Sequence, residues 1–264
     1  MYDFNFIRPA TAEAAIEALN GADDGQFMAG GQTLIPVLKQ RLAMPSDVID
    51  LGGIDDLVGI DVDAGTVSVG AMTTHAAVAA SAEILSAIPA LADLAGTIGD
   101  PHVRNRGTMG GSVANNDPAA DYPAAVVGLG ATIHTNHRAI AADEFFTDIF
   151  ETCLEDGELL TKITYPIPDK AAYVKFANPA SRYAVVGVFV SLSDGEARVA
   201  VTGAGPCVFR VAEMERALSA DFSAAAIEGI TVSDDNLNTD LHASAEYRAH
   251  LVGVMAGRAV AKAG

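Results

Sequence analysis

The sequence predicts an α+β protein that folds as two packed units. Its 264 residues exceed the roughly 100 to 200 residues of a typical single domain. The first part of the chain alternates strand and helix patterns around glycine-rich turns. After about residue 160 the pattern becomes that of antiparallel strands followed by alanine-rich helices. We place the boundary between residues 160 and 175 and divide the chain into units 1–170 and 171–264.

Hydrophobic spacing, caps and turn residues place the elements of the first unit. In chain order, they are helix 11–19, strand 26–29, a helix after Gly31 with Leu34, Leu38 and Leu42 on one face, strands 48–51 and 66–72, helix 90–98, helix 124–129 and strand 131–135. Thr73 or Thr74 is expected to cap a helix. Residues 99–121 are expected to form an extended loop, which is long for a compact domain and therefore functional or covered by another group.

The second set of elements is expected to be antiparallel. Its strands are 159–165, 172–176, 185–192 and 196–202, with a hairpin turn at 193–195 and alanine-rich helices at the end of the chain.

Composition excludes several classes of protein. With 50% apolar and 19% charged residues, the chain belongs among folded globular proteins. Its 16 basic and 34 acidic residues give a net charge of -18, which repels nucleic acid phosphates and anionic lipid surfaces. No signal peptide and no apolar run of about 18 residues is present, so no transmembrane segment is expected and the cytoplasm is the expected location.

The metal-ligating residue types are sparse and scattered. Cys153 and Cys207 cannot supply the four thiolates of an iron–sulfur cluster or a structural zinc site. The six histidines show no ligand spacing and are expected at the surface or in packing roles: His75, His102, His134, His137, His242 and His250. No GxSxG motif supports hydrolysis.

Two glycine-rich segments are the strongest candidates for a binding site. Residues 29–33 (AGGQT) lie between a strand and a helix, where glycine lets backbone N–H groups approach a phosphate. The alternative for this segment is a plain strand-to-helix turn. Residues 106–112 (RGTMGGS) repeat the pattern, and two such cradles suit a diphosphate. Valine in place of Gly110 or Gly111 is expected to abolish cofactor retention and to leave the fold intact.

Polar residues follow the second glycine-rich segment. Asn115, Asp117 and Asp121 come next in the chain, and Asp121 is of the residue type that accepts hydrogen bonds from a ribose. Its alternative role is a helix N-cap ahead of Pro123. Arg104 or Arg106 is expected to offset the phosphate charge.

Five segments of the chain carry a resemblance to a known family. They are AGGQT at 29–33, RGTMGGSVANNDPAADYPAA at 106–125, YVKFANPASRYAVVGVFV at 173–190, TGAG at 202–205 and SAEYRAHLVGV at 244–254. In this order, they resemble the FAD-binding medium subunits of carbon monoxide dehydrogenase-like and xanthine dehydrogenase-like molybdenum hydroxylases. The resemblance implies a PCMH, vanillyl-alcohol-oxidase-type FAD-binding domain of two α/β subdomains, followed by a smaller α+β flavoprotein C-terminal domain.

The resemblance also implies roles for individual residues. The pyrophosphate of FAD would be held by Ala29, Gly30, Gly31, Gln32 and Thr33 together with Thr108, Met109, Gly110, Gly111 and Ser112. Asn115 and Asp121 would reach the ribose or polyol side.

Four further residues match family positions close to the ring systems of FAD. Ile98 and Leu160 would pack on the flavin or adenine, with a plain core role as the alternative. Lys175 would place positive charge near the flavin, and its alternative is an exposed strand lysine. Tyr183 would lie beside the flavin and gate access to it, and its alternative is a core tyrosine.

The implied activity is that of an oxidoreductase subunit. Electrons would pass from a molybdopterin-containing large subunit through the 2Fe–2S clusters of a small subunit to FAD, and then to a quinone, NAD or oxygen, in a dimer of heterotrimers. The chain has AGGQT where carbon monoxide dehydrogenases have AGGHS, and Ser181-Arg182 where Gly-Asp often precedes the aromatic residue. These departures bear on the substrate, not on FAD. The alternatives are a stand-alone flavin oxidase of related fold and a nucleotide-binding scaffold without a redox role.

Overall fold

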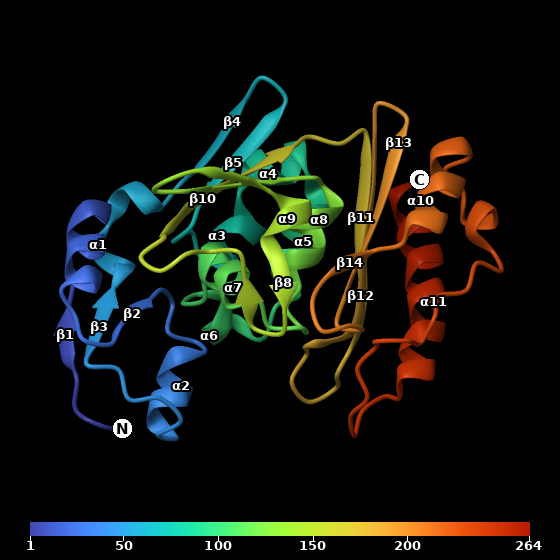
Figure 1. Cartoon of the computed structure of the whole chain (residues 1–264). Coiled ribbons are helices and arrows are strands. Elements are labelled where there is room, and N and C mark those ends of the chain that lie inside the picture. Colours follow the sequence, from blue (N-terminus) through green and yellow to red (C-terminus); the bar gives the residue numbers. More distant parts are fainter.

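The computed structural model describes all 264 residues and contains three main sheets, which follow one another along the chain, and one smaller two-stranded sheet (Figure 1). The first sheet is parallel, with strand order β1-β3-β2, and consists of β1 (Asn5–Ile7), β2 (Gly25–Met28) and β3 (Asp47–Asp50). Two helices accompany it, α1 (Ala12–Asn20) and α2 (Leu34–Lys39). The Thr11 hydroxyl caps α1 by accepting a hydrogen bond from the Ala14 amide.

The helix after Gly31 is shorter than the sequence predicts. It ends at Lys39 because Arg41 adopts a left-handed conformation with φ of 60° and the Leu42 amide turns back to the Val37 carbonyl. Leu42 therefore leaves the apolar face, and it is 73% exposed.

The second sheet is antiparallel and lies at the centre of the molecule. Its strands, in spatial order, are β4 (Ile60–Asp63), β5 (Thr66–Gly70), β10 (Leu160–Pro166), β6 (Thr132–Thr135) and β7 (Ala139–Ala141). Grouping 159–165 with the C-terminal strands was wrong. β10 lies between β5 and β6, with Ile163 paired to Val69 and Ile133, because its alternate residues complete the central core.

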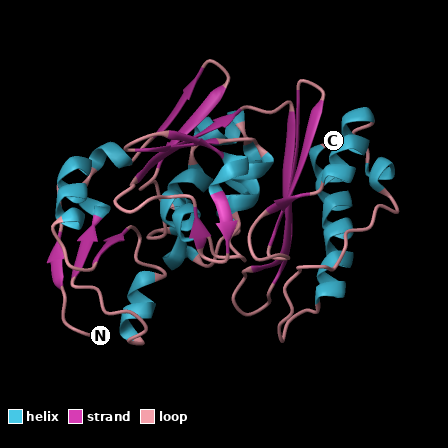
Figure 2. Ribbon diagram, in the orientation of Figure 1, coloured by secondary structure: helices cyan, strands magenta, loops and turns pink.

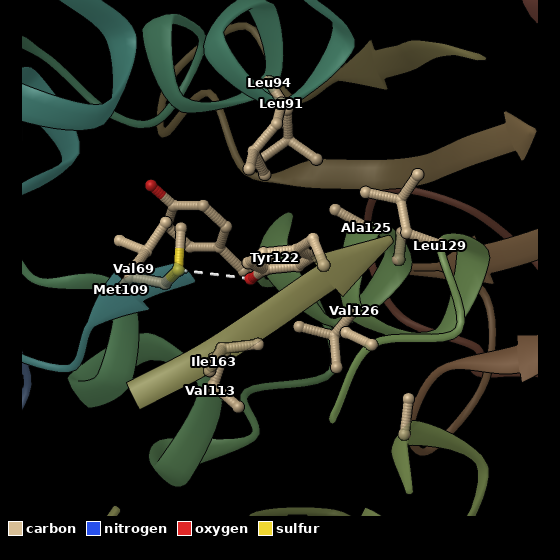
Figure 3. Packing of buried hydrophobic residues seen from close by; sticks show 14 of the residues in the cluster. Val69, Leu91, Leu94, Met109, Val113, Tyr122, Ala125, Val126, Leu129 and Ile163 are labelled. Carbon is tan, nitrogen blue, oxygen red and sulfur yellow. Dashed lines mark hydrogen bonds between the residues drawn. The ribbon is translucent and has the colours of Figure 1, made fainter. Parts of the chain in front are cut away.

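Helices cover one face of the central sheet. They are α3 (His75–Ala80), α4 (Ala82–Ala87), α5 (Pro89–Gly96), α7 (Met109–Asn115) and α8 (Tyr122–Gly128). Figure 3 shows Leu91 and Leu94 of α5 and Met109 of α7 packed near Val69 and Ile163 of the sheet. Each fully buried side chain of this size contributes roughly 1.5 to 3 kcal/mol relative to exposure. Thr74 caps α3, as expected for one of the two threonines.

Residues 99–121 are not an extended loop. They contain α6 (Pro101–Arg104) and α7, and the Thr108 hydroxyl caps α7 by accepting from the Gly111 amide. The two glycines mask the helix in the sequence, since glycine disfavours helix interiors. Gly110 is required there because a β carbon at this position would lie 2.6 Å from the Ala71 β carbon and 2.8 Å from the Ala71 carbonyl oxygen.

The third sheet and its helices form the C-terminal part. Its strands are β11 (Lys170–Ala177), β12 (Ala184–Ser193), β13 (Glu196–Thr202) and β14 (Phe209–Arg210), and its main helices are α10 (Ala212–Ala220) and α11 (Ala245–Ala263). The expected hairpin turn is present, with Asp194 and Gly195 at φ of 51° and 82°. Figure 2 shows α11 against one face of this sheet.

Helix α8 packs on the other face of the third sheet and joins the two parts. The Ser191 hydroxyl donates to the Gly128 carbonyl and the Arg198 Nε donates to the Val127 carbonyl, so the C-terminal end of α8 is satisfied by the third sheet. The chain passes from the second sheet to the third between Pro166 and Lys170, and division at residue 170 stays a prediction.

The remaining short elements lie in connections. They are α9 (Ala142–Phe145), the two-stranded pair β8 (Phe146–Asp148) and β9 (Glu151–Thr152), and 3-10 helices at Leu51–Gly53, Asp55–Leu57 and Ala224–Ile227. None of the helices is both long enough and apolar enough to cross a membrane.

The contact between Gly110 and Ala71 predicts the effect of substitution. Gly110→Val should lower the free energy of unfolding by about 2 kcal/mol, because the added methyl groups force backbone apart rather than a flexible side chain. The expectation of a largely intact fold stays a prediction, but the close contacts with Ala71 predict a measurable loss of stability. Gly257→Ala in α11 is the matched control, since nothing lies within 4 Å of its β carbon position and it should be neutral or stabilising. Urea unfolding of both variants checks this, and equal stability would contradict it.

Candidate functional site

A cavity of about 760 Å³ lies in the first 190 residues, within the usual range of small-molecule sites. It is lined by the N-terminal sheet and α2 on one side and by α7 and the end of β10 on the other. The turn between β11 and β12 reaches its edge through Ser181, Arg182 and Tyr183. Three parts of the chain that are distant in sequence therefore share one cavity.

The two glycine-rich segments meet in the wall of this cavity. A β carbon at Gly30 would lie 2.0 Å from the Arg106 carbonyl oxygen and 2.8 Å from the Gly107 α carbon. A β carbon at Gly111 would lie 3.0 Å from that of Ala29. No side chain fits between the segments, so their glycines bring two backbones into direct contact.

The first segment presents backbone donors that the protein itself does not use. The amides of residues 30 to 34 donate to no backbone or side-chain acceptor. The first amide after them, that of Ile35, donates to the Gly31 carbonyl at 3.1 Å. Gly31 has a φ of 71°, which favours glycine and turns the chain into α2. Successive free amides ahead of a helix form a site for an anion. A plain turn would not need this arrangement.

The second segment is different, because all of its amides except that of Thr108 already have partners. Met109 donates to the Thr73 carbonyl at 3.0 Å, Gly110 to the Ala71 carbonyl at 2.8 Å, and Ser112 to the Thr108 carbonyl at 3.1 Å. The Gly111 amide donates to the Thr108 hydroxyl at 3.1 Å. The backbone amides of residues 109 to 112 are therefore used within the protein, while the Thr108 amide and the hydroxyl and amide side chains of this segment are available to a ligand. The predicted part of this segment in holding a diphosphate stays a prediction.

Most of the predicted site residues line the cavity. They are Ala29, Gly30, Gly31, Gln32, Thr33, Ile98, Thr108, Gly110, Gly111, Ser112, Asn115, Asp121, Leu160 and Tyr183. Met109 does not line it, since its side chain is fully buried in the core and its sulfur accepts from the Tyr165 hydroxyl at 3.1 Å. Lys175 does not line it either.

Asp121 and Lys175 instead form a buried ion pair between α8 and β11. The Lys175 Nζ donates to the Asp121 Oδ2 at 3.0 Å and to the Thr97 carbonyl at 3.1 Å, and the Tyr173 hydroxyl donates to Oδ1. Burial raises the pKa of Asp121, while the Lys175 charge and the Tyr173 hydrogen bond oppose that rise. Only 7% of the Lys175 side chain is exposed, so the exposed-lysine alternative is wrong.

The Asp121–Lys175 ion pair also decides whether Asp121 caps helix α8. Asp121 occupies the N-cap position of α8 but makes no capping hydrogen bond, because both carboxylate oxygens are taken by Tyr173 and Lys175. The N-cap alternative is therefore wrong as well.

Tyr183 and Arg182 lie at the edge of the cavity. Tyr183 is 49% exposed, which rules out the core-tyrosine alternative. Burial of the remainder and the nearby Asp117 and Asp121 raise the pKa of its hydroxyl. Arg182 adopts a left-handed conformation with φ of 64°, and its guanidinium donates to the Gly99 carbonyl at 3.1 Å. This hydrogen bond ties the β11–β12 turn to the segment that carries Ile98.

Several cavity residues were missed from the sequence. The main ones are Phe27, Met72, His75, Phe150, Leu154, Glu158, Ser181 and Arg182. Glu158 had no local signal in the sequence, because its partner Arg138 lies 20 residues earlier, between β6 and β7. The guanidinium binds both of its carboxylate oxygens at 2.9 Å, and this contact lowers the pKa of Glu158 to about 2. Phe150 had no signal either, because only its backbone φ of 54° marks it.

His75 is the most unusual of the missed residues. It is 4% exposed, and its Nδ1 has no hydrogen-bond partner. Burial, aided by the positive charge of Arg104, lowers the pKa of the imidazole to about 4. The ring is therefore neutral near pH 7.

This pKa predicts how stability changes with pH. Between pH 6.5 and 4 the unfolded chain binds a proton at His75 that the folded chain does not, so stability is lost as pH falls through this window. From pH 7 to pH 5 the loss from this residue is about 2 kcal/mol. The free energy of unfolding of the cofactor-free protein, measured with urea at pH 7 and pH 5, should therefore fall less in His75→Leu than in the wild-type protein. Equal falls for the two proteins would contradict the assignment.

Comparisons with known proteins identify the family of this chain. Residues 2–168 match the family described as the FAD binding domain in molybdopterin dehydrogenase. The nicotine 6-hydroxylase medium subunit of Paenarthrobacter nicotinovorans is 34% identical, over 98% of this chain and 96% of that protein. The carbon monoxide dehydrogenase medium chain of Afipia carboxidovorans is also 34% identical, over 98% and 96%.

Solved structures confirm the α+β fold. A chain of quinoline 2-oxidoreductase from Pseudomonas putida 86 superposes with a TM-score of 0.90 and 30% identity, covering 99% of this chain and 96% of that one. The family, the FAD cofactor and the oxidoreductase class expected from the five motifs are confirmed. The chain belongs to the family of FAD-binding domains of the molybdopterin dehydrogenases.

Proposed function

We propose that the cavity holds FAD with its diphosphate on the free amides of residues 30 to 34. The observation that carries this proposal is the contrast between the two glycine-rich segments: the amides of residues 30 to 34 are all free, whereas in the second segment only the Thr108 amide is free. An anion is the ligand that a row of unpartnered amides attracts. The second segment supports the first by packing against it, and contributes the hydroxyls of Thr108 and Ser112 and the amide of Asn115 at the cavity wall.

The net charge of the chain makes this local arrangement necessary. A protein with a net charge of -18 repels an anionic cofactor at long range, so attraction must come from oriented dipoles and nearby cations. Arg104 lies beside the cavity, with its guanidinium held by the carbonyls of Ile98 and Gly99 at 3.0 and 3.2 Å. Its charge is felt at His75, which lines the cavity, and we propose that it offsets part of the phosphate charge.

The flavin end is proposed to lie near the β11–β12 turn. Ile98 and Tyr183 would contact the ring, and the Asp121–Lys175 pair would set the charge behind it. Bound FAD supplies the capacity to accept electrons from one partner and pass them to another. The residues of this chain bind and orient it. Asp121 keeps the Lys175 ammonium in one place, and Thr97 fixes it a second time.

The electron route is proposed to require other chains. Cys153 and Cys207 are both free, and two thiols cannot ligate a 2Fe–2S cluster. Relatives named for nicotine and for carbon monoxide share the same 34% identity with this chain, which suits a subunit whose partner determines the substrate. The partners are a molybdopterin-containing large subunit and a 2Fe–2S small subunit, in a dimer of heterotrimers. A quinone, NAD or oxygen takes the electrons.

Purification from the native host tests this function. The chain should co-purify with two other subunits that carry molybdenum and 2Fe–2S clusters, and the complex should show flavin absorption. The isolated chain, reconstituted with FAD, should show flavin bands and no turnover of a reducing substrate. Turnover by the isolated chain would instead indicate a stand-alone flavin oxidase. Absence of flavin bands after reconstitution would indicate a scaffold without a redox role.

A further inference from the structure

His75 lies directly behind the contact between the two glycine-rich segments. It is the first residue of α3, and its amide donates to the Gly107 carbonyl at 3.0 Å. A β carbon at Gly107 would lie 2.6 Å from the His75 Nε2, so the absence of a side chain there lets the imidazole reach the cavity wall. Gly30, whose amide is one of the free amides, also packs against Gly107, since a β carbon at Gly30 would lie 2.8 Å from the Gly107 α carbon.

The imidazole is held in place but not satisfied. Its ring packs against Tyr122 with centroids 5.3 Å apart. Only 4% of His75 is exposed, yet its Nδ1 has no hydrogen-bond partner, and the hydroxyl of Tyr122 has none either. Buried polar groups nearly always have hydrogen-bond partners, so the unpartnered Nδ1 lowers stability whether or not the cavity is filled, and packing alone gives no reason for a histidine at this position. A residue of leucine size would fill the same space without that cost.

We propose that His75 is a further FAD-binding residue, whose imidazole donates a hydrogen bond through Nε2 to an oxygen of the FAD diphosphate. This inference rests on the proposed binding of FAD in the cavity. Nε2 is the ring nitrogen that lies against Gly107, and the diphosphate on the free amides would supply acceptor oxygens next to it. His75 contacts the cofactor in the ground state and takes no part in electron transfer.

The neutral imidazole suits this role. A neutral ring donates one N–H and adds no charge that the cavity must accommodate when it is empty. The lowered pKa, about 4, keeps the ring in that form near pH 7. Arg104, the cation that disfavours protonation of the ring, is itself fixed on the Ile98 and Gly99 carbonyls.

The test compares stability with affinity in one variant. His75→Leu should raise the melting temperature of the cofactor-free protein at pH 7, because it removes an unpartnered buried polar group. The same change should weaken FAD binding about tenfold or more, measured by quenching of flavin fluorescence. A higher melting temperature together with weaker FAD binding would indicate a binding role. If His75 had only a packing role, the substitution would lower the melting temperature and leave the dissociation constant for FAD unchanged.

Two further variants complete the test. His75→Gln keeps an N–H donor and should recover most of the affinity, and it serves if His75→Leu fails to fold. His102→Leu is the matched control, since the His102 side chain is 98% exposed, and it should leave both quantities unchanged. Equal FAD affinity in the wild-type protein, His75→Leu and His75→Gln would overturn the inference. Failure of the wild-type protein to bind FAD would overturn the proposed function instead.

Discussion

The site depends on one steric constraint, the direct contact between two backbones at Gly30 and Gly107. The Arg106 carbonyl oxygen occupies the place where a side chain at residue 30 would begin. This contact brings the N-terminal sheet against the helices of the central sheet, and the cavity opens where the two meet. It also fixes which segment can bind an anion. The amides of α7 are used for folding, and those ahead of α2 remain free.

A second constraint connects this cavity with the C-terminal sheet. Three cations point at consecutive carbonyls just after α5: Lys175 at Thr97, Arg104 at Ile98 and Gly99, and Arg182 at Gly99. The C-terminal end of a helix carries partial negative charge, so it favours such partners. Because Lys175 and Arg182 come from β11 and the following turn, the position of the C-terminal sheet determines where Ile98 lies. A buried ion pair such as Asp121–Lys175 contributes little net stability, and its value here is to fix geometry.

Much of this could be predicted from the sequence, and the exceptions have physical causes. Regular hydrophobic spacing and caps located α1, β5, β12 and β13 to within a few residues. Local pattern could not assign β10 to the central sheet, because pairing with β5 is a long-range property. It also missed α7, whose glycines oppose helix propensity and are kept for contacts with Ala71 and Ala29.

The sequence could predict which residues belong to the candidate site, but not what each of them does there. The resemblance to the family assigned Gly31, Thr108, Asn115 and Leu160 to one FAD site, and all four line one cavity, yet the sequence could not show which amides were free. That property depends on the carbonyls of Ala71 and Thr73, which accept hydrogen bonds from the first amides of α7. Neither residue belongs to a recognisable motif. His75 was grouped with the other histidines because its burial arises from the packing of Tyr122 and Gly107 around it.

Hydrogen–deuterium exchange with and without FAD tests the central claim most directly. The amides of residues 30 to 34 have no protein partner, so they should exchange rapidly in the cofactor-free protein and become protected when FAD binds. The amides of residues 109 to 112 already have partners and should change little. New protection at residues 109 to 112, with none at residues 30 to 34, would show that the diphosphate is held elsewhere.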